Sequence, residues 1–491
     1  MKPEETLYDH VSPGKVRNDF QGILMERLML DMHWFLGRFR RIFFMALPES
    51  EADYEKSRRR YIVGDAASQT IVQLAGGAFL VSLMLSVGFS DAQAGVLTSV
   101  ASLAALFQLF TMQMVNHLKK RKLFVCLMTM QKLYLAFIFF IPLLPIQDGS
   151  RQLLVITGYF IAQICAQIGT PATQDWIASL VPARLRGNYF SRKDAVCVFV
   201  TVTMMLVSGI VMDAATGERQ NMGFTLNGSM ILLLVLLNAW AFSCMKEPRL
   251  GEMNADGKEI HGKLRYKYSK KNVVHHGNLF AEMRDAFGSA DFRMAFTLTL
   301  LWQTSFYCAT PFNSSYQLEE LGMPFTFIMV VGFLCNMLRI AITPLMGKLG
   351  DKHGMAFLYK YSLLGILLYF IFFALAVPSN AYPMVILGTV SSALGWSFAG
   401  IGLFGVQLEL LNETKRDIQL SILLALSGVY GFLVSFVSGC LLDFLQKVLV
   451  SLPGQRLYAQ QFTNALGAGF LLLTILYLKC RVQKRERQPE T

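Results

Sequence analysis

Long apolar segments alternate with short polar ones along most of the 491-residue chain. An apolar run that can cross the roughly 30 Å hydrocarbon core of a bilayer must be helical, because lipid leaves no partner for unpaired backbone groups. Twelve such runs occur, at 67–89, 94–115, 123–145, 153–177, 195–212, 224–245, 294–312, 325–346, 357–377, 384–408, 418–445 and 462–478. The pattern predicts an all-α integral membrane protein with twelve transmembrane helices.

The longest hydrophilic loop, 246–293, divides the predicted spans into two sets of six. We expect an N-terminal half at 67–245 and a C-terminal half at 294–480, preceded by a segment at 1–66 and followed by a tail at 481–491. Transmembrane proteins with this organisation are commonly built from structural repeats.

Lysine and arginine are distributed unevenly between the two sets of loops. The exceptions are Arg151, Arg219, Lys447 and Arg456 in alternate loops, and Lys132 and Arg339 inside predicted helices. The remaining 39 of the 45 Lys and Arg residues therefore fall on one side. Cytoplasmic loops carry this excess, so both termini and the central loop are predicted to be cytoplasmic, in a multi-pass protein of the cell's inner (plasma) membrane.

Residues 20–47 within the N-terminal segment are apolar but interrupted by charge too often to span a membrane. On a helical wheel the charged residues occupy one half and the apolar ones the other. This pattern is typical of an amphipathic helix lying in the headgroup plane of an anionic leaflet. An ordinary helix packed on the cytoplasmic ends of the bundle is the alternative.

Composition excludes several other functions. Hydrophobic residues make up 54% of the chain and charged residues 16%, whereas soluble domains average about 45–50% and 25%. The net charge of +12 is spread over short clusters between apolar runs, which argues against nucleic-acid binding. None of the eight cysteines has C-x-x-C spacing, so no zinc site is predicted, and no acid, Ser, His or Cys constellation indicates an enzyme.

Charges at membrane depth are costly and are therefore candidate functional residues. Arg339 lies about 10 Å inside the eighth span at 1.5 Å per residue, and is predicted to contact an anionic solute or a gate. Lys132 in the third span is a second candidate, although it could snorkel to the headgroups. Asp175 and Glu409, near the ends of the fourth and tenth spans, are plausible partners for these cations. For all four the alternative is a structural ion pair.

Three amide or aromatic side chains, Gln303, Asn336 and Trp396, are further candidates for lining a solute cavity. Each also fits a helix–helix hydrogen bond or an interface anchor. The first predicted span carries Gln69 and Gln73 but no acid. Proton coupling, sodium coupling and facilitated diffusion all stay open, and no other cofactor is expected.

Paired loops in the two halves point to a known family. After the fourth span, Leu180-Val181 begins six residues before Arg186, and after the tenth, Leu410-Leu411 begins six residues before Arg416. Between the eighth and ninth spans, Gly347, Leu349, Asp351, Lys352 and Gly354 resemble the G-x-L-x-D-R-x-G signature of the major facilitator superfamily. The segment WIASLVPARLRGNYF at 176–190 looks like the corresponding loop of a bacterial subgroup whose substrate is unassigned.

The resemblance implies two six-helix halves around a central cavity, which rock between inward-open and outward-open states. It also implies that Asp351 latches the cytoplasmic ends of the eighth and eleventh helices, where its charge would suit a helix N-terminus. A local turn-stabilising role is the alternative. The first-half copy of the signature, at 116–122, has no acid in the Asp position.

We therefore predict a monomeric secondary active or facilitative transporter that moves a small solute across the cytoplasmic membrane by alternating access. Its partners would be the solute and the lipid bilayer, with no nucleic acid. A non-transporting membrane sensor and a membrane-embedded transferase are the alternatives. The solute and the direction of transport cannot be read from these residues.

Overall fold

The computed structural model describes residues 52–107, 121–182, 186–215, 217–246, 279–411, 416–450 and 457–483. The chain divides into two units, Met1–Glu55 and Lys56–Thr491, and the contacts discussed below lie within the second. The amphipathic helix predicted at 20–47 lies outside the described residues.

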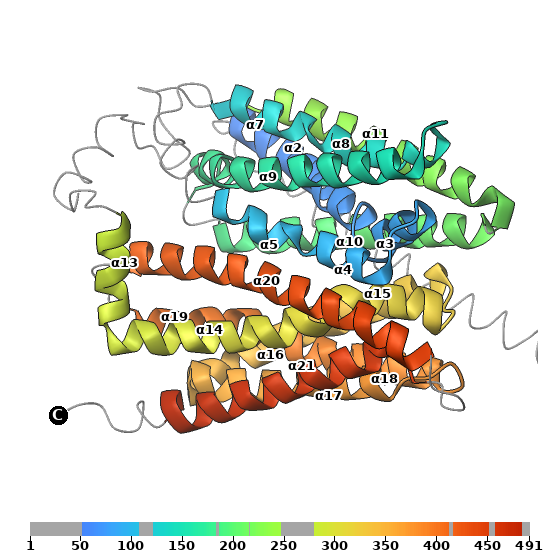
Figure 1. Ribbon diagram of the computed structural model, residues 1–491. Helices are drawn as coiled ribbons and strands as arrows, with labels where there is room; N and C mark the ends of the chain where they lie inside the picture. The colour runs from blue at the N-terminus through green and yellow to red at the C-terminus, as the bar shows by residue number, and fades with distance from the viewer. Residues whose placement is uncertain are drawn as a thin grey trace, which may run out of the picture. The chain divides into compact units, whose positions relative to one another are not determined.

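Every element in these described ranges is helical, and the helices form two sets (Figure 1). The first set comprises α2 (Ala52–Leu74), α3 (Gly77–Ser86), α4 (Asp91–Thr98), α5 (Val100–Ala104), α7 (Arg121–Met130), α8 (Lys132–Ile138), η2 (Ile141–Leu143), α9 (Asp148–Leu180), α10 (Arg186–Ala214), η4 (Gly217–Arg219) and α11 (Gln220–Ser243). It corresponds to the N-terminal half.

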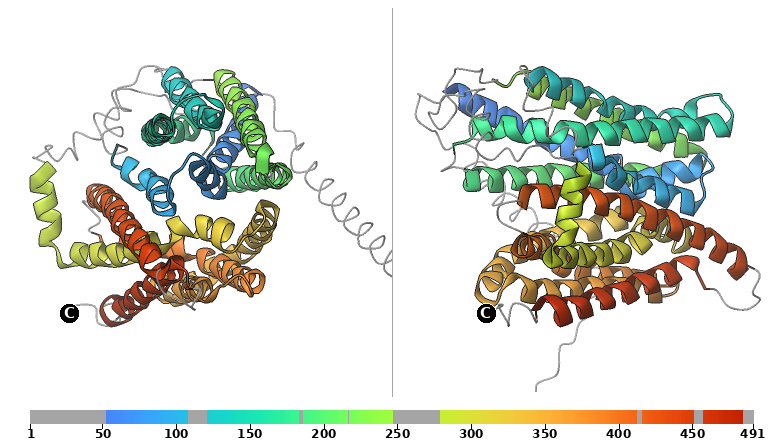
Figure 2. Two further views of the ribbon diagram at one scale, coloured as in Figure 1. Left: turned by 45° about the vertical axis from the view of Figure 1, so that its right-hand side comes forward. Right: turned by 60° about the vertical axis from the view of Figure 1, so that its left-hand side comes forward.

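The second set corresponds to the C-terminal half. It comprises α13 (Leu279–Gly288), α14 (Ala290–Ala309), η5 (Thr310–Phe312), α15 (Asn313–Ser315), η6 (Tyr316–Glu320), α16 (Phe325–His353), α17 (Met355–Leu375), α18 (Ala381–Trp396), α19 (Ala399–Leu410), α20 (Arg416–Val450), α21 (Ala459–Tyr477) and η7 (Leu478–Val482). Figure 2 shows the same two sets from two further sides.

Each of the twelve predicted spans overlaps one or more of these helices. Within the described residues, eight helices are long and apolar enough to cross a membrane, and the bent pair α2 and α3 makes nine. Large apolar side chains such as Leu153, Leu233 and Phe444 are more than 60% exposed, as lipid-facing residues should be. The predicted all-α membrane fold is confirmed.

Two glycine positions set the course of the chain. The first span bends by 43° between α2 and α3, where Gly77 has a φ of +50°, in the left-handed region that favours glycine. Gly354 has a φ of +89° and forms the whole connection between α16 and α17. The glycine at the end of the signature loop is thus required by the backbone.

The helices run between two ends that differ in charge. We name the basic end for Arg58, Arg60, Lys246 and Lys352, and the acidic end for Asp91, Asp213, Glu319 and Glu320. At the basic end α2 is bonded to its neighbours, because the Arg58 side chain donates to the Leu180 carbonyl at 3.2 Å and Lys246 N–H donates to Ser57 Oγ at 2.9 Å.

Polar bonds join the two halves at the acidic end. The two carboxylate oxygens of Asp213, at the end of α10, accept the backbone N–H groups of Phe325 and Thr326 at 2.7 Å each. The Gln446 side chain on α20 donates to Asp91 at the start of α4, also at 2.7 Å. The Asp213 carboxylate therefore caps a helix that belongs to the opposite half.

Apolar packing joins the halves between their middle and the acidic end. The rings of Phe79 on α3 and Phe325 on α16 stack with centroids 5.6 Å apart. At Gly428 on α20, a Cβ atom would lie 2.5 Å from the carbonyl oxygen of Ser102 on α5, so only glycine permits this approach.

Candidate functional site

A cavity of about 550 Å³ lies inside the N-terminal half, and we call it the site cavity. Helices α2, α7, α8, α9, α10 and α11 all contribute side chains to its wall. Its charged lining residues are Asp65, Lys132 and Lys193, and hydroxyl and amide groups surround them. A volume of this size is within the range of small-molecule sites.

One face of α2 supplies much of this wall. Tyr61, Asp65, Ser68, Gln69 and Val72 all line the site cavity. Their spacing of three and four residues is the spacing of one face of an α-helix, so a continuous helix through Asp65 is what aims the carboxylate inward.

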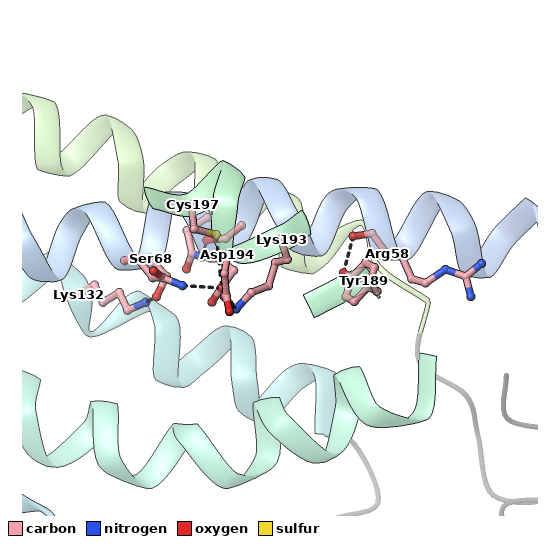
Figure 3. A network of polar contacts seen from close by, with 11 residues as sticks. Arg58, Ser68, Lys132, Tyr189, Lys193, Asp194 and Cys197 are labelled. Atoms are coloured by element: carbon pink, nitrogen blue, oxygen red, sulfur yellow. Dashed lines mark hydrogen bonds and ion pairs between the residues drawn. The ribbon is translucent and has the colours of Figure 1, made fainter. Parts of the chain in front are cut away.

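The Asp65 carboxylate is the centre of a polar network. Figure 3 labels Lys193, Asp194 and Ser68 among the residues of this region. Lys193 Nζ on α10 lies 2.8 Å from Asp65 Oδ2, and the Gln69 side chain donates to the same oxygen at 2.9 Å. Lys193 also lies 2.8 Å from Asp194, whose side chain is 64% exposed. The cation is therefore shared between a buried carboxylate and an exposed one.

Lys132 reaches the same network from α8. Its ammonium donates to the hydroxyl of Ser68, and Asp65 acts on it electrostatically. Figure 3 shows Lys132 and Ser68 facing one another beside Lys193 and Asp194. The charge predicted at Lys132 is thus on the wall of a cavity.

Hydrogen bonds hold α2 in register with its neighbours. Thr70 and Thr201 on α10 share a hydrogen bond of 3.0 Å, Tyr189 donates to the Arg58 carbonyl at 2.8 Å, and Asn238 on α11 donates to the Gly64 carbonyl. These buried bonds fix the rotation of the helix that carries Asp65.

A second cavity of about 310 Å³ adjoins the first and shares Ser68, Gln69 and Val72 with it. Its other walls include Thr201 on α10 and Asn336 on α16, so both halves contribute. Asn336 is the one predicted site residue of the C-terminal half that lines a cavity described here.

A third cavity of about 670 Å³ lies at the acidic end, among residues of both halves. Asp91, Glu319 and Glu320 line it together with the amides Gln220 and Gln446. Burial raises the pKa of Glu320 above its ordinary value of 4.5, and the charges of Asp91 and Glu319 raise it further.

The remaining predicted site residues lie outside the site cavity. Arg339 is exposed on α16, and the described residues contribute no hydrogen bond or ion pair to its guanidinium. Gln303 is partly buried on α14, and Glu409 is exposed on α19. Trp396 packs edge-on against Trp302, with ring centroids 5.6 Å apart, inside the C-terminal half. These roles, and that of Asp175, whose backbone is part of α9, stay predictions.

The signature residues occupy helix ends. Gly347, Asp351 and Lys352 belong to the last turns of α16, and Lys352 is exposed. Arg186 and Arg416 are the first residues of α10 and α20. The proposed latch between Asp351 and the start of α20 stays a prediction, because the Asp351 side chain lies outside what the structure describes.

Two central residues of the site were not predicted. The expectation that the first span has no acid is wrong, because α2 begins at Ala52 and includes Asp65. Likewise α10 begins at Arg186 and includes Lys193, two residues before the predicted span at 195. An apolar run in the sequence identifies only the part of a helix that is compatible with lipid. The four-residue spacing of Tyr61, Asp65 and Gln69 is the signal that would have found this face.

The chain resembles known transporters in sequence pattern and fold. A family model described as the Major Facilitator Superfamily matches residues 64–441. Comparison with curated protein sequences finds no match. A mutant of the nucleoside transporter NupG superposes with a TM-score of 0.62 at 12% identity, covering 86% of this chain and 99% of that one.

Two further structures are similar. A D-xylose-proton symporter has a TM-score of 0.62 at 13% identity, covering 87% of this chain and 97% of its own. A bacterial homologue of the iron transporter ferroportin, in an inward-facing state, has a TM-score of 0.55 at 14% identity, covering 86% and 98%. Identities this low establish the fold alone, but the family model spans most of the sequence. The chain belongs to the major facilitator superfamily.

Proposed function

We propose that this multi-pass membrane protein moves a small polar solute across the cytoplasmic membrane by alternating access, with the site cavity as the solute site. The family and the transporter neighbours support solute transport. The observation that carries the proposal is the charged cavity itself, in which Lys132, inside a predicted span, lies together with Asp65 and Lys193, each two residues before one.

The contacts between the halves support one particular conformation. The bonds of Asp213 and of Gln446, and the stacking of Phe79 on Phe325, lie toward the acidic end. We infer a state closed at the acidic end, whose cavity opens toward the basic end. Because basic loops are retained in the cytoplasm, this is an inward-open state with cytoplasmic termini.

Coupling to a proton or sodium ion would use Asp65. A coupled carrier needs a carboxylate that exchanges partners, and Asp65 lines the cavity while it is paired with Lys193. Release of Asp65 from Lys193 on cation binding would link the ion to the solute site.

The test is uptake into proteoliposomes of radiolabelled D-xylose, uridine, L-lactate and D-gluconate, with and without an imposed pH gradient. At least one solute should accumulate, and Asp65→Asn should reduce its uptake at least tenfold. Asp148→Asn is the matched control, because Asp148 is 76% exposed and pairs only locally with Arg151. Absence of uptake for the whole set, or equal uptake by Asp65→Asn, contradicts the proposal.

A further inference from the structure

Among the described residues that line the site cavity, positive charges outnumber negative ones by one, and the exposed Asp194 is not among them. Two lysines and one aspartate are its charged lining residues, and the other polar groups on its wall are neutral hydroxyls, amides and a thiol. A concave, low-dielectric wall with an excess of one sign favours ligands of the opposite sign.

Two carboxylates, Asp65 on the cavity wall and Asp194 next to Lys193 in the sequence, both contact the same lysine. Asp65 and Asp194 each lie 2.8 Å from Lys193 Nζ. Lys132 instead donates to the neutral hydroxyl of Ser68, and within the described residues this is its hydrogen-bonded partner. Lys132 is therefore the cation whose charge a ligand can neutralise.

A partly buried ammonium without a bonded counterion is costly in free energy. An anion that pairs with Lys132 removes this cost while it gains a charge-assisted hydrogen bond. A neutral solute gains neither effect. The cavity should therefore discriminate strongly between a carboxylate and its uncharged amide.

Hydroxyl groups on α7 and α9 add a second requirement. Thr129, Thr170 and Thr173 all line the cavity, and each donates to a carbonyl four residues earlier, at 2.8, 2.8 and 2.9 Å. Their donors are occupied, so their oxygens can only accept from a ligand. A ligand that carries hydroxyl donors satisfies these acceptors.

We propose that the site cavity binds a small hydroxylated organic anion, whose carboxylate pairs with the Lys132 ammonium and whose hydroxyls donate to the threonines. The proposal names the substrate class of the function proposed above and rests on it. Lys132 is a direct ligand contact, whereas Ser68 positions its ammonium.

The test is thermal stabilisation of the purified full-length protein by four probes: D-gluconate, L-lactate and their amides, gluconamide and lactamide. A ligand that binds the folded state raises its melting temperature. Gluconate or lactate should raise it, and the matching amide should not. An equal effect of acid and amide, or no effect of either acid, overturns the proposal.

Three variants locate the effect. Lys132→Gln should weaken binding of the active acid by about tenfold or more, because a charge-assisted hydrogen bond is lost. Lys132→Arg should keep a carboxylate-dependent shift. Lys360→Gln is the matched control, since Lys360 is on α17 and lies over the Tyr361 ring, away from the cavity. Unchanged binding by Lys132→Gln overturns the proposal.

Ser68→Ala covers the case in which Lys132→Gln does not fold. It keeps the Lys132 charge but removes the hydroxyl that positions the ammonium, so the acid should bind several-fold more weakly and still bind better than its amide. An unchanged acid affinity, or equal shifts by acid and amide, overturns the proposal. Transport is measured separately. Uptake of a neutral solute that depends on Asp65 but not on Lys132 would support the proposed transport function and contradict the anionic substrate class. Acid-specific stabilisation without any uptake would support the anionic ligand and contradict the transport function.

Discussion

At the scale of single residues, Lys193 and Lys132 differ in what neutralises them. Lys193 forms ion pairs with the carboxylates of Asp65 and Asp194, whereas Lys132 donates a hydrogen bond to the hydroxyl of Ser68. Lys132 was predictable from sequence, because a lysine inside an apolar run stands out at membrane depth. Asp65 and Lys193 were not, because each lies two residues before an apolar run, where sequence alone does not reveal that the helix has already begun.

The Asp65–Lys193 pair should couple the two residues energetically. Their side chains are 17% and 12% exposed, so either single substitution, Asp65→Asn or Lys193→Gln, leaves a poorly solvated charge. The double variant should be less destabilised than the two singles together, with a coupling of about 1–3 kcal/mol by denaturant or thermal unfolding.

The exposed pair Asp148–Arg151, at 3.0 Å, is the control for this cycle and should couple by no more than about 0.5 kcal/mol. Additive effects at Asp65 and Lys193 would show that the two side chains are not paired in the membrane.

Glu320 should make stability depend on pH. Burial, then the charges of Asp91 and Glu319, raise its pKa in the folded protein, so folding favours its protonated form. The stability that this provides is present at low pH and is lost as pH rises through the raised pKa. Glu320→Gln should therefore melt higher than the wild type at neutral pH and equally at low pH.

Gln220→Glu tests the same cavity in the opposite direction. A further carboxylate among Asp91, Glu319 and Glu320 should steepen the fall of melting temperature with pH. Superimposable pH profiles for wild type and Glu320→Gln would show that Glu320 ionises as freely in the folded protein as in the unfolded chain.

At the scale of elements, the apolar pattern predicts where helices cross the membrane but not where they end. The helix α2 extends 15 residues before the predicted span at 67, and α10 extends nine residues before the one at 195. In both cases the added turns include charged side chains, such as Arg58, Asp65 and Lys193, that contact another helix or line the cavity. Side-chain partners in other helices compensate for that polarity, and a hydropathy pattern contains no information about them.

The connection between α16 and α17 gives a prediction at this scale. Gly354→Ala should destabilise the protein by about 1–3 kcal/mol, because its φ of +89° is strained for any residue with a Cβ atom. A Cβ atom there would meet nothing within 4 Å, so the cost is one of backbone conformation alone.

Gly332→Ala is the matched control, since Gly332 is inside α16 and a Cβ atom there also meets nothing within 4 Å. It should be neutral or stabilising by up to about 1 kcal/mol. Equal melting temperatures for the two variants would argue that the turn at Gly354 relaxes without cost.

At the scale of the whole molecule, the two sequence halves are joined by contacts that no pattern in either half indicates. The Asp213 carboxylate at the end of α10 caps α16, and Gly428 on α20 allows close approach of α5. The division at the central loop was readable from the sequence, whereas these contacts depend on how the halves meet. The conformational state was for the same reason beyond prediction.

Asp213→Ala should shift the balance between conformational states. Loss of one helix cap costs about 1 kcal/mol, which is about fivefold in an equilibrium. Cys165, which lines the site cavity, is a built-in reporter once the other cysteines are replaced. Its labelling by a maleimide from the basic end should become several-fold slower in Asp213→Ala.

Ser90→Ala is the control for this experiment. Ser90 caps α4 together with Gln93, but within one half, so its loss should lower stability without changing the labelling rate. The same rate in wild type and Asp213→Ala would mean that the cap does not hold the acidic end closed.

The two glycines between α2 and α3 divide the first span into lengths with different attachments. Asp65 is on α2, which is bonded to α9, α10 and α11 of its own half. Phe79 is on α3 and stacks against the opposite half. A motion that separates the two halves breaks the contacts of α3, whereas α2 stays attached to the N-terminal half. Substitutions on the cavity face of α2 should therefore change the solute specificity of the proposed site and leave the contact between Phe79 on α3 and Phe325 intact.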